Sequence, residues 1–208
     1  MKIKDYLLPL PGTVLGMSLA AADYNVSWKT ACCAALVPIL MQMLVNAKKN
    51  SLLFFVFLVA SVMGILGAVY FSYNTIFVLE TFLILMIAYM GYNHRNGSHL
   101  YTFLFYGVAA VCGSYFLGSH SFGTWLLLLP ALSVGAMTAS VSTRKTPMRL
   151  LLVAAGWAAM IAYACLRMFD PWHFLFVLSL PLFFTKRSEL ATFVFTLLAG
   201  GGFLVYLI

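Results

Sequence analysis

Apolar residues fall into nine long runs along the chain, separated by short clusters of charged and turn-forming residues such as Asp23–Asn25. Most runs are near the roughly 20 residues that an α-helix needs to cross the hydrocarbon of a bilayer, and the eighth is shorter. The pattern predicts nine membrane-spanning helices, at residues 7–22, 28–46, 52–72, 75–91, 100–117, 122–141, 148–167, 171–185 and 189–207.

The composition agrees with this reading of the pattern. Hydrophobic residues make up 63% of the 208 residues, the mean hydropathy is +1.00, and only five side chains are acidic. A chain this apolar cannot cover a water-facing surface with polar groups, so we expect an all-α integral membrane protein. No small-residue cleavage site follows the first run, which predicts that this run stays as a membrane helix. We expect one polytopic membrane domain, residues 1–208, without a soluble domain.

Basic residues predict how the helices are oriented, because cytoplasmic loops of membrane proteins collect lysine and arginine. With nine spans and a cytoplasmic N-terminus, ten of the twelve cations fall at cytoplasmic ends. These ten are Lys2, Lys4, Lys48, Lys49, Arg95, Arg144, Lys145, Arg149, Lys186 and Arg187. Only Lys29 and Arg167 fall on the other side. We therefore predict a C-terminus on the side opposite to the cytoplasm.

Few residues are candidates for chemistry. No two of the five acids have a spacing that places paired carboxylates on one helix face, and no carboxylate magnesium site is visible. Glu80 alone falls inside a predicted span; an acid there is a functional hypothesis, although a protonated or helix-bonded structural acid is the interpretation that we favour. The four cysteines lack the spacing of a metal site or redox pair. The net charge of +7 does not predict nucleic-acid binding, because no basic, aromatic-interleaved surface lies outside the spans.

Two basic clusters and one histidine-containing loop remain as candidate binding residues. The clusters are Lys48–Lys49, and Arg144–Lys145 with Arg149. Their simpler role is to fix topology and to contact anionic lipid headgroups; the alternative is a shared site for a phosphate or diphosphate head. His94 and His99 lie in the stretch "GYNHRNGSHLY", which is a candidate for holding a polar headgroup. We predict no catalytic residue.

One long stretch has a specific pattern: "LYTFLFYGVAAVCGSYFLGSHSFGTWLLLLPALSVGAMTASV", residues 100–141. The matching positions are Phe105-Tyr106-Gly107, Ala110-Val111, Gly113-Ser114-Tyr115 and Leu128-Leu129-Pro130. This stretch resembles the middle of the UbiA-type intramembrane prenyltransferases, in particular the branch that prenylates 1,4-dihydroxy-2-naphthoate in menaquinone synthesis. The stretch "LPLPGTVLGMSLA" at 8–20 resembles the opening helix of the family. The resemblance implies a bundle of nine helices with a cytoplasmic N-terminus.

The aspartate-rich motifs of that family are missing. Family members bind an allylic diphosphate through Mg²⁺, held by two such motifs that follow the second and sixth helices. Gln42 and Asn46 resemble the residues that lead into the first motif, but its aspartate positions fall on Asn50 and Leu53. At the second motif the chain reads "STRKTPMR", and His99 lies in the region of a further lost acid. The resemblance places Gln42, Asn46, Asn50, His94 and His99 at a polar cavity rim. We expect no bound Mg²⁺, since its ligands are absent.

The resemblance and the lost acids together lead to a functional expectation. We expect a UbiA-like protein of a bacterial cytoplasmic membrane that binds an isoprenoid, a quinone or another amphiphilic lipid, or supports a membrane partner, without Mg²⁺-dependent prenyl transfer. Two alternatives stay open. One is an active, atypical prenyltransferase that binds the diphosphate through its basic residues. The other is a membrane scaffold or assembly subunit, in which Gly107, Gly113 and Gly200–Gly202 allow close contacts with other helices.

Overall fold

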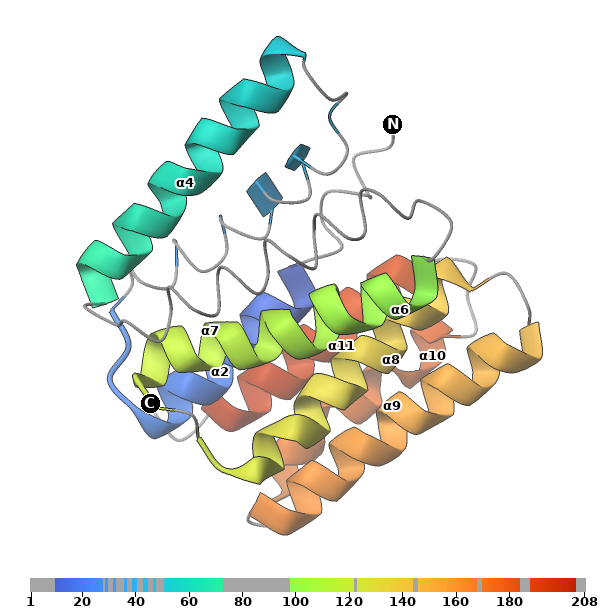
Figure 1. The fold of residues 1–208 in the computed structure, drawn as a ribbon. Helices are drawn as coiled ribbons and strands as arrows, with labels where there is room; N and C mark the ends of the chain where they lie inside the picture. Colours follow the sequence, from blue (N-terminus) through green and yellow to red (C-terminus); the bar gives the residue numbers. More distant parts are fainter. Residues whose placement is uncertain are drawn as a thin grey trace.

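The computed structural model describes most of the chain in seven segments. These are residues 10–27, 51–72, 98–121, 123–143, 146–167, 170–183 and 188–204, together with isolated residues at 29, 32, 36, 39, 40, 43, 44 and 47. The described residues form an all-helical structure (Figure 1).

Seven helical rods make up this described part of the chain, and three of them are interrupted by a change of helix type. The rods are α2 (Leu10–Asp23), α4 (Leu52–Ser72), α6–η1–α7 (Ser98–Thr102, Phe103–Ala109 and Ala110–Ser119), η2–α8 (Trp125–Leu127 and Leu128–Ser142), α9 (Thr146–Arg167), η3–α10 (Pro171–Ser179 and Leu180–Phe183) and α11 (Ser188–Leu204).

Seven of the nine predicted runs coincide with these rods, with each boundary agreeing within about three residues. The run at 75–91, and with it Glu80, lies outside the described residues, and the run at 28–46 is described only at isolated positions. Within the described segments, three helices are long and apolar enough to cross a membrane: His99–Ser119, Trp125–Ser142 and Thr146–Arg167. Three spanning candidates are therefore established by length and composition, while the count of nine remains a prediction.

The bundle is built around α2, which packs against α7 on one side and α11 on the other, while α8 packs against η1 and α9 (Figure 1). Fully buried apolar side chains fill the space between these helices; among them are Leu15, Leu19, Val111, Val134, Met137, Phe176 and Phe195. The long helix α4 lies to one side of the bundle, where Phe54, Phe57 and Leu58 pack near Phe105 and Tyr106. Most of its remaining apolar side chains are exposed, which is typical of a helix surrounded by lipid.

Glycines let the backbones of neighbouring helices touch. A Cβ atom on Gly12 would overlap the carbonyl oxygen of Tyr106, and one on Gly107 would overlap the backbone of Gly135. Small residues at helix crossings are the usual means of close packing in membranes, where lipid is as apolar as the side chains it would replace. The approaches at Gly107 and Gly202, two positions that the sequence suggested for contacts with other proteins, are thus used between helices of this chain.

Buried hydroxyl groups are accommodated by hydrogen bonds to backbone carbonyls one helical turn earlier. Ser18 donates to the carbonyl of Val14 at 2.8 Å, and Ser114 donates to that of Ala110 at 2.7 Å. Ser133 instead crosses from α8 to α9 and donates to the carbonyl of Gly156 at 2.7 Å. Because an unsatisfied hydroxyl is costly in an apolar surrounding, these bonds explain how small polar residues are tolerated inside the bundle.

One stretch of the 98–119 rod departs from the regular α-helix. Residues Phe103–Ala109 form a π-helix, in which the N–H of Ala110 points to the carbonyls of Phe105 and Gly107. The hydroxyl of Thr138, on the facing helix α8, lies 3.4 Å from the carbonyl of Thr102 at the start of this stretch. The apolar run at 100–117 predicted a helix here but not its type, because a run that is apolar on every face has no periodicity that would indicate a π-helix.

Adjacent glycines in α11 give a matched test of this packing. Gly202→Ala is expected to lower the free energy of unfolding by about 1–3 kcal/mol, because its Cβ would overlap the carbonyl of Trp172. Gly201→Ala is the control, since no described atom lies within 4 Å of its Cβ position, and it should be neutral or stabilising through helix propensity. Unfolding by detergent titration, followed by circular dichroism, measures both. Equal effects of the two substitutions would contradict the packing.

Candidate functional site

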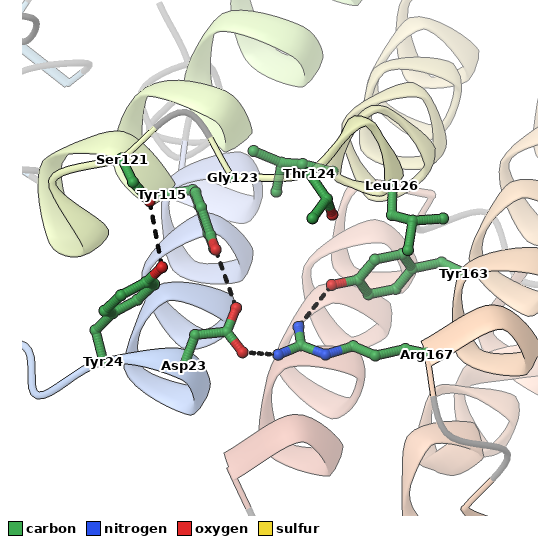
Figure 2. Close-up of a pocket in the computed structure, with 10 residues that line it drawn as sticks. Asp23, Tyr24, Tyr115, Ser121, Gly123, Thr124, Leu126, Tyr163 and Arg167 are labelled. Atoms are coloured by element: carbon green, nitrogen blue, oxygen red, sulfur yellow. Dashed lines mark hydrogen bonds and ion pairs between the residues drawn. The ribbon is translucent and has the colours of Figure 1, made fainter.

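A cavity of about 520 Å³ opens where four helix ends meet (Figure 2). The C-terminal ends of α2, α7 and α9 and the beginning of η2 surround it, together with the short connection between α7 and η2. Its lining residues are Asp23, Tyr24, Tyr115, Ser121, Gly123, Thr124, Leu126, Leu127, Tyr163 and Arg167. Residues far apart in the sequence, on helices that pack around α2 and α8, thus share one polar chamber.

An ion pair between Asp23 and Arg167 lies at the centre of the lining, and two tyrosines extend it (Figure 2). Tyr115 donates its hydroxyl to Oδ2 of Asp23 at 3.0 Å, and Arg167 donates from Nη1 to the hydroxyl oxygen of Tyr163 at 2.7 Å. The Asp23 and Arg167 side chains are 29% and 23% exposed. This partial exposure suits a pair that faces a cavity, since a fully buried pair would carry a larger desolvation penalty.

Aromatic rings hold the guanidinium of Arg167 in place. Its central carbon lies 5.9 Å from the centre of the Tyr163 ring and 5.5 Å from that of Phe203 on α11. The Tyr163 and Phe203 rings are themselves packed edge to face, with centres 5.3 Å apart. Cation–π contacts of this kind favour a fixed guanidinium orientation. Arg167 is therefore positioned from three directions before any ligand binds.

The connection after α7 forms one wall of the cavity. His120 ends α7 in the left-handed conformation, with φ of 56°, and donates its N–H to the carbonyl of Phe116. Gly123 has φ of 63° and lies so close over the Tyr115 ring that a Cβ would come within 2.7 Å of it. The hydroxyls of Ser121 and Tyr24 lie 3.3 Å apart, which links this connection to the end of α2. The wall is thus tied to its neighbours on both sides.

Large aromatic side chains are exposed at the same end of the bundle. Trp125 is 71% exposed, Trp172 is 50% exposed and Tyr24 is 45% exposed. Tryptophan and tyrosine gather at the level of the lipid headgroups, because their rings are apolar and their N–H or O–H groups are polar. The three residues give this end of the bundle the aromatic surface that is typical of membrane proteins at the level of the headgroups.

Two of the sequence-predicted site residues, His99 and Arg149, are described, and both lie toward the other end of the same helices. His99 is exposed at the start of the 98–119 rod, where its Nδ1 lies 3.1 Å from the Ser142 hydroxyl and 3.4 Å from that of Thr143. Since 16 helical residues separate His99 from Tyr115, the two ends are about 24 Å apart. Arg149 is half-buried in the first turns of α9. The other predicted residues lie outside the described residues; they are Gln42, Asn46, Lys48, Lys49, Asn50, His94, Arg144 and Lys145.

A magnesium ion does not fit the described positions to which the family resemblance points. Leu53, the position on which the resemblance would place one aspartate of the first motif, is apolar and 61% exposed in the first turn of α4. Within the described ranges, no three histidine, cysteine or acidic side chains gather as a metal site. Mg²⁺ requires oxygen ligands in near-ideal octahedral geometry, which a leucine cannot supply.

The cavity was not identified from the sequence, although one signal pointed to it. Asp23 directly follows the first predicted span, and Arg167 is one of two cations predicted on the side opposite to the cytoplasm. Opposite charges at the same membrane face, in a chain with so few charges, are candidates for an ion pair. Tyr115 and Tyr163 gave no comparable signal, because aromatic residues are common throughout the apolar runs.

Comparison of the chain with protein-family models, with curated proteins and with solved structures found no match.

The ion pair is expected to stabilise the bundle, which a double-mutant cycle can measure. Asp23→Asn leaves Arg167 without its counter-charge and should lower the free energy of unfolding by about 1–3 kcal/mol. The variant with both Asp23→Asn and Arg167→Gln should lose less than the sum of the two single losses, since no uncompensated charge remains. Unfolding in mild detergent gives all four free energies. Strictly additive losses would show that the pair contributes nothing.

Proposed function

We propose that this chain is a helical membrane protein that binds an amphiphilic lipid of isoprenoid or quinone type and does not catalyse Mg²⁺-dependent prenyl transfer. The observation that carries this proposal is the cavity, in which Arg167, Asp23 and two tyrosine hydroxyls face a chamber of about 520 Å³. A chamber of that size falls within the range of small-molecule sites, which combine apolar walls with a few placed polar groups.

The lining suits a molecule that is polar at one end and apolar at the other. Leu126 and Leu127 supply apolar surface beside the polar side chains. Next to them, Leu128 and Leu132 lie one turn apart on α8 and are 52% and 42% exposed. A lipid tail following this stripe would stay in hydrocarbon while its head entered the cavity.

A UbiA-like bundle of nine spans with a cytoplasmic N-terminus, in a bacterial cytoplasmic membrane, is part of the proposal. The order and lengths of the seven described rods support it, as does the alternation of helix ends: His99 and Ser142 lie at one face, and Asp23 and Arg167 at the other. In this topology the cavity faces away from the cytoplasm, and the basic clusters predicted from the sequence face toward it.

This orientation can be tested by cysteine labelling in a variant whose four native cysteines are replaced by alanine. A membrane-impermeant maleimide added to intact cells should label Ser121→Cys, which lies at the cavity face. Thr146→Cys, at the start of α9, should react only after the membrane is permeabilised. The reverse labelling pattern would contradict the proposed topology.

The proposal excludes ordinary prenyl transfer on chemical grounds. Ionising an allylic diphosphate requires preorganised cations that neutralise the charge developing on the leaving group. In the cavity, the charge of Arg167 is already neutralised by Asp23. An atypical transferase would have to rely on Lys48, Lys49, Arg144 and Lys145, which lack the charge density of a metal ion. A scaffold role has less support, because the close approaches of Gly107 and Gly202 are internal.

Filling the cavity should displace a bound amphiphile. Leu126→Trp adds bulk to a lining residue, whereas Leu150→Trp adds the same bulk to a side chain that is 64% exposed at the start of α9, at the opposite end of that helix from Arg167 and outside the lining. We expect the first substitution to reduce an amphiphile that co-purifies with the wild type at least threefold, and the second to leave it unchanged. Quantitative mass spectrometry of lipids extracted from detergent-purified protein is the measurement.

Two results would contradict this proposal. One is equal lipid retention by the two tryptophan variants, which would mean that lipid associates with the outer surface rather than the cavity. The other is turnover of a prenyl diphosphate and 1,4-dihydroxy-2-naphthoate by the purified wild type with Mg²⁺. If Lys48→Ala with Arg144→Ala abolished such turnover, the atypical transferase would be the better description.

A further inference from the structure

The hydrogen bonds within the cavity determine which donor and acceptor groups remain available to a ligand. In Asp23, Oδ1 accepts from Arg167 and Oδ2 accepts from Tyr115. Arg167 uses two of its five N–H groups on partners among the described residues, namely Asp23 and Tyr163. The oxygen of Tyr163 accepts from Arg167, so its own hydrogen points elsewhere. The groups left over thus include donors, namely three N–H groups of Arg167 and the hydroxyl hydrogen of Tyr163, beside unused lone pairs on the Asp23 and tyrosine oxygens.

The same contacts fix the net charge that a ligand meets. Asp23 and Arg167 are the charged side chains of the lining, and they form an ion pair with each other. The cavity thus combines hydrogen-bond donors with a net charge of zero, a combination that distinguishes it from the basic clusters predicted at the other membrane face.

We propose that the cavity selects an amphiphile with an uncharged head that carries hydrogen-bond acceptors, such as carbonyl oxygens. This inference rests on the proposed function and names the chemistry of the head. A carbonyl oxygen accepts from Tyr163 and Arg167 while the Arg167–Asp23 pair stays intact. An uncharged head also loses less hydration than an ion on entering a chamber walled by Leu126 and Leu127.

Charged heads fit this site less well. A phosphate would compete with Asp23 for the guanidinium and would leave a carboxylate without its counter-charge in a half-buried place. A zwitterionic head would have to separate Arg167 from Asp23 to pair with each of them. Arg167 resists such a movement, because its guanidinium also contacts the Tyr163 and Phe203 rings.

Three amphiphiles with the same tail separate these possibilities. They are decylubiquinone, whose fully substituted ring does not react with thiols, decyl phosphate and decylphosphocholine. Each is added at equal mole fraction to the full chain in lipid nanodiscs, and the thermal unfolding midpoint gives a half-saturating mole fraction. We expect decylubiquinone to saturate at a mole fraction at least fivefold lower than either charged amphiphile.

A hydroxyl deletion links this binding to the cavity. Tyr163→Phe keeps the buried ring but removes the donor, and it should weaken decylubiquinone binding about fivefold. Tyr70→Phe is the matched control, because Tyr70 is 67% exposed on α4 and does not line the cavity. Tyr70→Phe should bind like the wild type.

Three other outcomes would contradict the uncharged head, the proposed function or the position of the head at Tyr163. If either charged amphiphile binds as tightly as decylubiquinone, the uncharged head is wrong and the proposed amphiphile binding stands. If none of the three binds, the proposed function fails together with this inference. If decylubiquinone binds equally well to the wild type and both tyrosine variants, the bound head does not lie at Tyr163.

Discussion

The structure depends on helix backbones coming into direct contact. In a membrane, apolar side chains gain little by leaving lipid for one another, so helices associate through close packing and internal hydrogen bonds. Gly12 and Gly16 bring α2 against the 98–119 rod, Gly107 and Gly135 bring that rod against α8, and Ser133 bonds α8 to α9 through the carbonyl of Gly156. These successive contacts run through the centre of the bundle. They hold α2, the 98–119 rod, α8 and α9 together.

The polar cavity is a consequence of this packing. Once α2, α7, α8 and α9 are fixed against each other, their ends on one side of the bundle bring Asp23, Tyr115, Tyr163 and Arg167 within hydrogen-bonding reach. Asp23 and Arg167 then neutralise each other, which explains how two ionisable side chains are tolerated at the end of an apolar bundle. Trp125 and Trp172 are exposed at the same end of the bundle, so close packing, charge pairing and exposed aromatic rings coincide there.

The sequence predicted the positions of helices better than their internal geometry. The bounds of α4 were predicted at both ends, because Lys48–Ser51 and the "SYN" stretch at 72–74 interrupt an otherwise unbroken apolar run. The eighth run was expected as one short helix, whereas Pro171–Ser179 is 3₁₀-helical and only Leu180–Phe183 is α-helical. A run that is apolar on every face carries no periodicity to distinguish these forms. The cavity was beyond prediction for a different reason: it requires knowing that residues 23, 115, 163 and 167 converge.

The π-helical stretch has a consequence for the orientation of α7. A π-turn accommodates one residue more than the α-helical spacing, and each residue of an α-helix turns the chain by about 100°. Phe103–Ala109 therefore sets the rotational phase of everything that follows it in the rod. Phe105 and Tyr106 face the side of α4, while Tyr115 reaches Asp23 at the far end. In a regular α-helix of the same sequence, the Tyr115 side chain would be rotated about the helix axis by about a quarter-turn, away from Asp23. The π-helical stretch thus rotates α7 relative to the beginning of the rod, so that the rod contacts α4 through Phe105 and Tyr106 and contacts Asp23 through Tyr115.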